Sequence, residues 1–141
     1  MLHRRTLVAS LASLPLLASA RPRPLPAECR WILGTWHSDV EQTMANFSLE
    51  GKAPTPEMRA RLAQMFGKLS HTITPTHFTV EETFNSQSTR RSWAYEVDSF
   101  SASSVSLVFP AAGMPGITLF RKNDAYFIRT GSNFEYFKKT P

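Results

Sequence analysis

The chain has 141 residues, of which 42% are hydrophobic and 19% charged, and its formal net charge is +5. This apolar content is too high for a disordered chain, and the length suits one domain whose core needs no disulfide framework or structural metal. The single cysteine excludes an internal disulfide.

Residues 1–20 have the layout of an export signal. Arg4 and Arg5 form a basic head, an apolar run covers residues 7–17, and the Ala-Ser-Ala sequence at 18–20 supplies small residues before a cleavage site. The apolar run is shorter than the roughly 20 residues that cross a bilayer, so no membrane span is expected. The pattern predicts a periplasmic or secreted protein, exported by the general route or by the twin-arginine route that the arginine pair suggests.

A proline-rich tether at residues 21–29 separates this segment from a single domain at residues 30–141. The alternating prolines of the tether exclude a regular helix or a central strand. Cys29 is expected to be a partly buried small hydrophobe rather than a redox group. Glu28 directly before it does not fit the signal for a lipid anchor.

The domain is predicted to begin with a strand over residues 32–39, followed by helices. Apolar residues at helical spacing between 40 and 47 predict a short helix. Thr55 and Pro56 are a strong start for a second helix, which is expected to end near Gly67. The apolar stripe of this second helix, expected to be buried, is Met58, Leu62, Met65 and Phe66.

From Leu69 onward the hydrophobic period becomes two, which predicts strands. Turn residues such as Asn123-Asp124 separate them. The predicted strands cover residues 71–74, 77–84, 90–98, 105–109, 117–119, 126–128 and 134–138. With the first strand they favour an all-β fold, an antiparallel barrel of about eight strands with a helical insertion after the first strand.

Three segments together resemble a known family. The first is Trp31–Asp39, which carries Gly34-Thr35-Trp36 on the first predicted strand. The second is Phe66–Leu69, at the end of the helical insertion, and the third is Glu135–Lys139, near the end of the domain. In this order they resemble small exported bacterial lipocalin-like proteins of the calycin superfamily, over roughly residues 30–139. The chain differs from larger lipocalins by lacking their usual disulfide and by carrying the helix at 55–67, which is expected to plug a barrel mouth or act as a lid.

The resemblance implies a structural role for Trp36. Its ring is expected to close one end of the barrel beneath a basic residue from the last strands. The candidates for that residue are Arg129, Lys138 and Lys139. A cation over an indole face contributes about 0.5–2 kcal/mol.

An eight-stranded barrel is just wide enough for packed side chains or for one small ligand. The aromatic residues expected to point inward are Phe78, Phe84, Trp93, Tyr95, Phe109, Tyr126, Phe134 and Tyr136. They either fill the barrel or line a cavity for an apolar ligand. Glu82 and Arg121, which lie on apolar faces of their strands, form a buried ion pair, orient a ligand or lie at the rim.

No pattern predicts catalysis or a metal site. Ser38 and His37 are consecutive on a strand and point to opposite faces, so they cannot form a triad by themselves. His37 and Asp39 share a face that His71 or His77 could join, but no recognised metal-binding spacing is present. The chain also lacks a phosphate-binding glycine loop and a concentrated basic patch, so no nucleic-acid partner is expected.

The sequence therefore predicts a monomeric, non-enzymatic binding module for a small apolar or amphipathic molecule, without a cofactor. The expected ligand-binding residues are Phe84, Trp93, Tyr95, Phe109 and Tyr126, together with Glu82 and Arg121. The main alternative is a filled barrel that recognises an envelope protein, as an inhibitor or assembly factor does. A minor alternative is an enzyme that uses His37 or Glu82.

Overall fold

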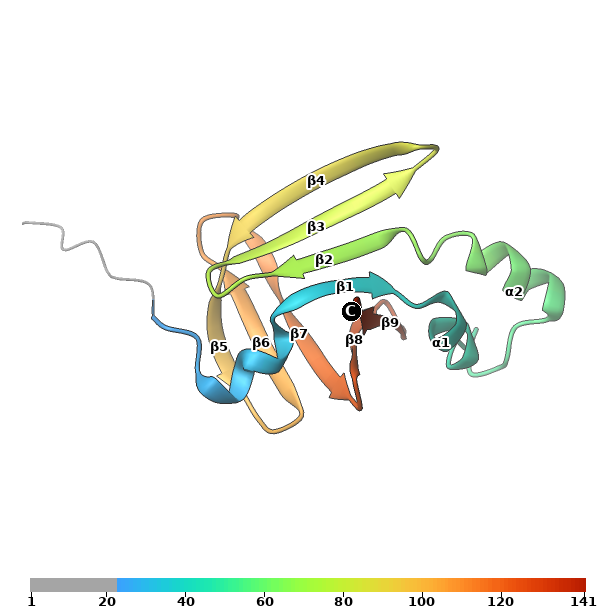
Figure 1. Ribbon diagram of the computed structural model, residues 1–141. Helices are drawn as coiled ribbons and strands as arrows, with labels where there is room; N and C mark the ends of the chain where they lie inside the picture. Colours follow the sequence, from blue (N-terminus) through green and yellow to red (C-terminus); the bar gives the residue numbers. More distant parts are fainter. Residues whose placement is uncertain (1–22) are drawn as a thin grey trace, which may run out of the picture.

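A computed structural model describes residues 23–141 (Figure 1), so the predicted export signal lies outside the described residues. The strands are β1 (Gly34–Ser38), β2 (Leu69–Ile73), β3 (His77–Phe84), β4 (Gln87–Ala94), β5 (Glu96–Phe100), β6 (Ser104–Phe109), β7 (Met114–Lys122), β8 (Ala125–Thr130) and β9 (Asn133–Lys139). The helices are the 3-10 helix η1 (Ala27–Ile32), α1 (Val40–Ala45) and α2 (Pro56–Ala63). Within the described residues, no helix has both the length and the apolar character needed to cross a membrane.

The nine strands form one antiparallel sheet that curls into a nearly closed barrel, which confirms the predicted all-β fold. The strand order is β4-β3-β2-β1-β9-β8-β7-β6-β5. Strands β4 and β5, which follow one another in the chain, therefore lie at the two edges of the sheet. The barrel has a seam where these edges approach, and one connection crosses it (Figure 1).

The single strand predicted over residues 90–98 is wrong, because the chain turns there between β4 and β5. Tyr95 occupies the corner, and its hydroxyl donates a hydrogen bond of 2.7 Å to the Thr74 carbonyl in the turn between β2 and β3. On β4, Trp93 pairs with the interior residue Phe78, and on β5, Val97 pairs with the interior residue Leu107. The alternation of inward and outward side chains therefore continues on either side of the corner. The hydrophobic pattern of residues 90–98 consequently does not indicate that one strand ends and another begins there.

Trp36 closes one end of the barrel, in the position predicted for it. Its ring is buried, and its Nε1–H donates a hydrogen bond of 2.8 Å to the Ile32 carbonyl of η1. Of the three candidate cations, Lys139 takes the place over the ring, with Nζ 5.2 Å from the ring centroid. Gly34 makes this approach possible, because it has a φ of +122° and a Cβ there would lie 2.7 Å from Lys139 Cε.

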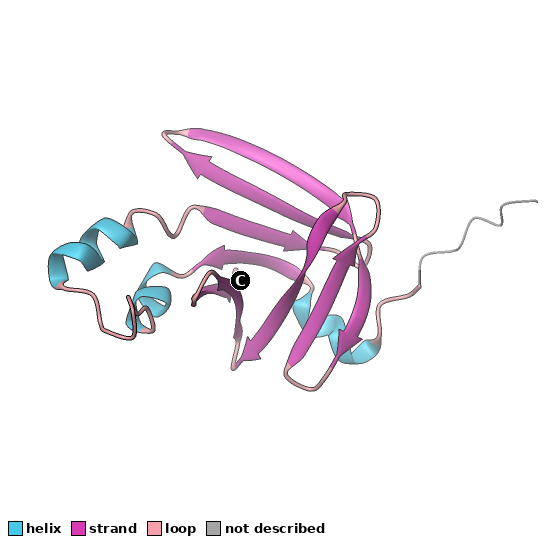
Figure 2. Cartoon of the chain, turned by 180° about the vertical axis from the view of Figure 1, so that it is seen from behind, coloured by secondary structure: helices cyan, strands magenta, loops and turns pink. Residues whose placement is uncertain are grey.

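The helical insertion lies at the opposite end of the barrel from η1 (Figure 2). The predicted start of α2 is confirmed, since the Thr55 hydroxyl accepts a hydrogen bond of 3.3 Å from the Met58 N–H. The predicted buried stripe is wrong: Met58 and Met65 are exposed, Met65 by 68%. The helix ends at Ala63 rather than near Gly67, so Met65 and Phe66 lie beyond it. Leu62 and Phe66 are only half-buried, because α2 packs against α1 at the margin of the barrel instead of entering it.

Candidate functional site

Aromatic side chains fill the centre of the barrel. The Phe109 ring lies 5.9 Å from that of Phe78 and 6.3 Å from that of Trp93, between centroids. The Tyr126 ring stacks on Phe137 at 5.2 Å. These residues belong to or pack against one hydrophobic cluster. At the level of Phe109 and Tyr126 the interior is therefore a packed core, and the predicted ligand-binding residues Trp93, Phe109 and Tyr126 contribute to it.

Three other predicted ligand-binding residues lie outside this core. Glu82 and Phe84 continue the inner face of β3, but they lie toward the tip of the β3–β4 hairpin and are exposed, Phe84 by 55%. Arg121 is exposed near the η1 end, with its guanidinium carbon 5.6 Å from the centroid of the Trp31 ring. Neither ion pair formed between described residues involves Glu82 or Arg121, so these two charges lie at the rim.

The inward direction predicted for Phe134 and Tyr136 is wrong. In the register of the β8–β9 pair, Tyr126 lies opposite Phe137, which turns Phe137 into the core. Phe134 and Tyr136 then face outward, because neighbouring strand residues point to opposite faces. Since β9 carries aromatic residues on both faces, its hydrophobic pattern does not specify which face is buried.

The barrel also contains a buried polar cluster, formed by Ser38, His71, Tyr126 and Glu135. The Ser38 hydroxyl donates a hydrogen bond of 2.5 Å to Glu135 Oε1 and accepts one of 3.0 Å from the Gly67 N–H. His71 Nδ1 lies 2.5 Å from the Tyr126 hydroxyl, to which it is hydrogen-bonded. Ser38 is thus bonded to Glu135 rather than to His71, and the cluster lacks the geometry of a serine–histidine nucleophile.

Burial determines the protonation states of this cluster. It lowers the pKa of His71 to about 3, so the imidazole is neutral near pH 7. It raises the pKa of Tyr126 well above 10, and the Glu135 carboxylate raises it further. Burial also raises the pKa of Glu135, whereas the hydrogen bond from Ser38 lowers it. The cluster ties the end of the helical insertion, at Gly67, to the barrel.

The Ser38→Ala variant is expected to lose about 1–3 kcal/mol of unfolding free energy, because Glu135 and the Gly67 N–H each lose a buried partner. Urea unfolding at neutral pH measures this loss. Ser70→Ala is the matched control, since Ser70 is only half-buried on β2, and it should change the stability by less than about 0.5 kcal/mol. Equal losses of unfolding free energy in the two variants would show that the hydrogen bonds of Ser38 do not stabilise the fold.

The histidines do not gather into a metal site. His71 lies inside the barrel, whereas His37 and His77 are exposed. Residues 23–141 contain no group of three or more histidine, cysteine, aspartate or glutamate residues arranged to hold a metal ion.

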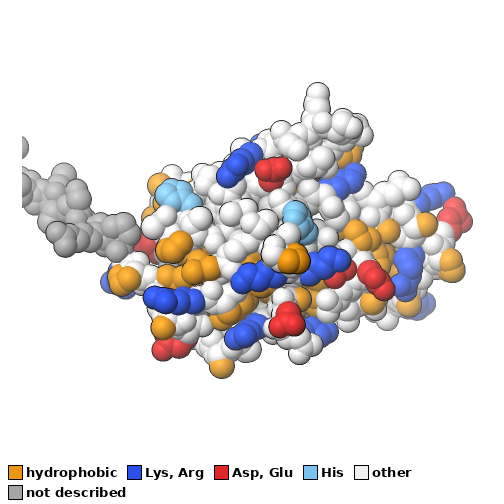
Figure 3. Space-filling model, in the orientation of Figure 1, with side chains coloured by type: hydrophobic (Ala, Val, Ile, Leu, Met, Phe, Trp, Pro, Cys, Tyr) orange, Lys and Arg blue, Asp and Glu red, His pale blue; other side chains and the backbone are white. Residues whose placement is uncertain are grey.

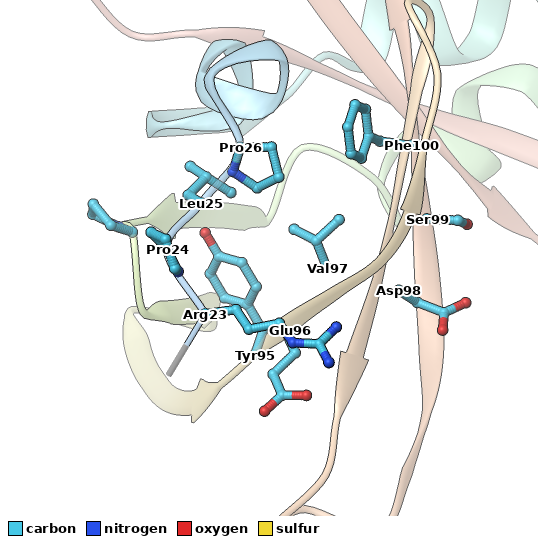
Figure 4. Close-up of a pocket in the computed structure, with 11 residues that line it drawn as sticks. Arg23, Pro24, Leu25, Pro26, Tyr95, Glu96, Val97, Asp98, Ser99 and Phe100 are labelled. Atoms are coloured by element: carbon cyan, nitrogen blue, oxygen red, sulfur yellow. The ribbon is translucent and has the colours of Figure 1, made fainter. Parts of the chain in front are cut away.

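A groove of about 460 Å³ runs between the N-terminal segment and the edge strand β5 (Figure 4). Its lining comprises Arg23, Pro24, Leu25, Pro26, Pro75, Tyr95, Glu96, Val97, Asp98, Ser99 and Phe100. The sheet register shifts between Val97 and Ser99, and this bulge brings Val97 and Phe100 to the same face of β5 although they are three residues apart. Among the predicted ligand-binding residues, Tyr95 lines this groove.

The groove has apolar walls, and Arg23, Glu96 and Asp98 add charges to its lining. Figure 4 shows Leu25 and Pro26 on one side and Val97 and Phe100 on the other. Phe100 is 46% exposed and is available to a ligand. Burial raises the pKa of Tyr95 to about 12, so its side chain stays neutral and presents an apolar ring. Local sequence patterns could not reveal this site, because its two walls are some 70 residues apart in the chain.

No family model matches the chain, and no curated protein matches it. The resemblance to lipocalin-like proteins therefore stays a prediction, because a barrel alone does not identify that family.

Proposed function

We propose that this protein is a non-enzymatic binding protein that holds a small apolar or amphipathic molecule in the groove between the N-terminal segment and β5. The observation that carries the proposal is the groove itself. Its volume of about 460 Å³ falls within the range of about 300–1,000 Å³ typical of small-molecule sites. The ligand class is the one that the sequence predicts, but the site lies at the seam of the barrel rather than at its packed centre.

The composition of the groove favours an amphipathic ligand. Leu25, Val97 and Phe100 offer apolar surface for a hydrocarbon or aromatic part. Arg23 and Glu96 add charges of both signs, which suit a polar end group that keeps contact with water. The hydroxyl of Tyr95 already donates to Thr74, so the contribution of this residue to a ligand is its ring.

Export is part of the same proposal. It is supported by the basic head, apolar run and small residues of residues 1–20. The lipocalin-like segments also support it, since the family that they resemble consists of exported proteins.

Replacing Phe100 with serine is expected to weaken binding of the neutral apolar dye N-phenyl-1-naphthylamine by about tenfold, because the variant loses apolar contact area in the groove. A fluorescence titration of the purified protein measures the dissociation constant. The fold should tolerate the change, since the Phe100 side chain is 46% exposed.

Phe84→Ser is the matched control, because Phe84 is similarly exposed and lies at the hairpin tip, outside the groove. Its affinity for the dye should equal that of the unmodified protein. The groove is not the site if both variants lose the same affinity, or if the unmodified protein does not bind the dye.

A further inference from the structure

Strands β7, β8 and β9 carry a row of aromatic residues on the outer face of the barrel. Phe127 on β8 is the cross-strand partner of Phe120 on β7, and their ring centroids are 5.2 Å apart. Phe127 is also the partner of Tyr136 on β9, with ring centroids 5.1 Å apart. Phe134 meets the Phe127 ring at 5.2 Å and is 37% exposed, while Phe120 and Phe127 are half-buried. Tyr136 is buried, and Lys122 Nζ lies 5.2 Å from the centroid of its ring. Phe120, Phe127 and Phe134 therefore leave aromatic surface in contact with solvent.

The same outer face is basic. Lys122, Arg129 and Lys138 each follow an aromatic residue of the row by two positions, so they lie on its side of the sheet. All three are exposed. The one acidic residue within these three strands is Glu135, which points inward. Asp39 approaches Lys138 to 3.9 Å and offsets part of its charge.

The other half of the barrel presents a different outer surface. Cross-strand hydroxyl pairs cover it, such as Thr35 with Thr72 at 3.3 Å and Thr79 with Ser92 at 2.9 Å. In Figure 3 the surface over β2–β4 is mostly white, the colour of polar uncharged side chains and backbone. The combination of aromatic and basic residues is therefore a local feature of β7–β9 rather than a general property of the barrel.

We propose that the outer face of β7–β9 docks on an anionic lipid bilayer. The three basic side chains match the negative charge of the lipid phosphates. The aromatic edges between them suit the boundary between headgroups and acyl chains, where amphipathic protein surfaces bind. A single-stranded nucleic acid fits less well, because base stacking needs open ring faces. The Phe120 and Phe127 rings stack on each other with an interplanar angle of 16° and so cover their own faces.

Vesicle co-sedimentation tests this proposal, with phosphatidylcholine vesicles that either contain or lack phosphatidylglycerol. The protein is expected to bind only the vesicles that contain phosphatidylglycerol and to be released by high salt, which screens the charges. Arg129→Glu and Phe134→Ser are each expected to weaken this partitioning by about tenfold. Lys122→Glu is a further exposed charge reversal with the same expected effect.

Matched controls lie elsewhere on the barrel. Arg90→Glu on β4 and Phe84→Ser at the hairpin tip change the same residue types and should leave vesicle binding unchanged. The groove variant Phe100→Ser should also bind vesicles normally, which separates this proposal from that of the groove. Equal binding to vesicles without phosphatidylglycerol, equal losses in the control variants, or binding of a single-stranded oligonucleotide without binding of vesicles would each overturn the proposal.

Discussion

The Trp36→Ala variant is expected to lose about 3–5 kcal/mol of unfolding free energy, which corresponds to a fall in Tm of about 10 °C or more. The indole is buried and packs edge-on against Tyr126 at 4.7 Å. Its removal leaves a cavity at the end of the barrel, deprives the Ile32 carbonyl of its donor and takes away the ring beneath Lys139. Thermal and urea unfolding, followed by circular dichroism, measure the loss.

Two further substitutions separate the contributions to this effect. Trp36→Phe keeps an aromatic ring below Lys139 but lacks the N–H donor, so an intermediate loss of about 1–2 kcal/mol is expected. Trp31→Ala should cost less than Trp36→Ala, since Trp31 is only half-buried and its Nε1 makes no hydrogen bond within the described residues. A Trp36→Ala protein with the same Tm as the unmodified protein would contradict the role of Trp36 in closing the barrel.

The elements that the sequence predicts well are those that local rules determine. Residues 77–84 alternate between polar and apolar side chains except at Glu82, and β3 has those same bounds. The Asn123-Asp124 turn appears where expected, with a positive φ of 54° at Asn123 that asparagine tolerates. The cap and proline at Thr55-Pro56 likewise start α2. In each case a few neighbouring residues contain the physical cause.

The errors arise where the outcome depends on distant parts of the chain. Phe84 continues an apolar alternation, but the β3–β4 hairpin extends beyond the strands that would cover it, and this overhang is not visible in the hairpin's own residues. The orientation of Phe134 depends on the pairing of β9 with β8. Apolar residues recur at helical spacing from Met58 to Phe66 and so predict a buried stripe, yet α2 ends at Ala63 and packs mainly against α1.

The candidate sites could not be predicted from the sequence either, because each of them joins residues that are far apart in the chain. Ser38 meets Glu135 across 97 positions of sequence, and His71 meets Tyr126 across 55. The groove joins β5 to residues 23–26, for which the sequence predicts only a tether. Tyr95 is the predicted ligand-binding residue that reaches the groove, because the corner between β4 and β5 lies at the seam of the barrel.

Acid is expected to destabilise the protein through His71, with a slope of about 1.4 kcal/mol per pH unit. The imidazole takes up a proton near pH 6.5 in the unfolded chain but only near pH 3 in the folded barrel, because burial disfavours its charged form. Between these values the unfolded chain holds the additional proton, so the free energy of unfolding falls as the pH falls. Urea unfolding at several pH values between about 6.5 and 3 measures the slope.

Matched glutamine variants assign this slope. His71→Gln keeps a polar partner for Tyr126 without a titrating group and should flatten the slope, whereas His77→Gln changes an exposed histidine and should leave it unchanged. Glu135 acts in the opposite direction, because its raised pKa lets the folded state hold the extra proton just above pH 4.5. Glu135→Gln should therefore steepen the loss of stability there. An unaltered slope in His71→Gln would mean that another group controls the acid response.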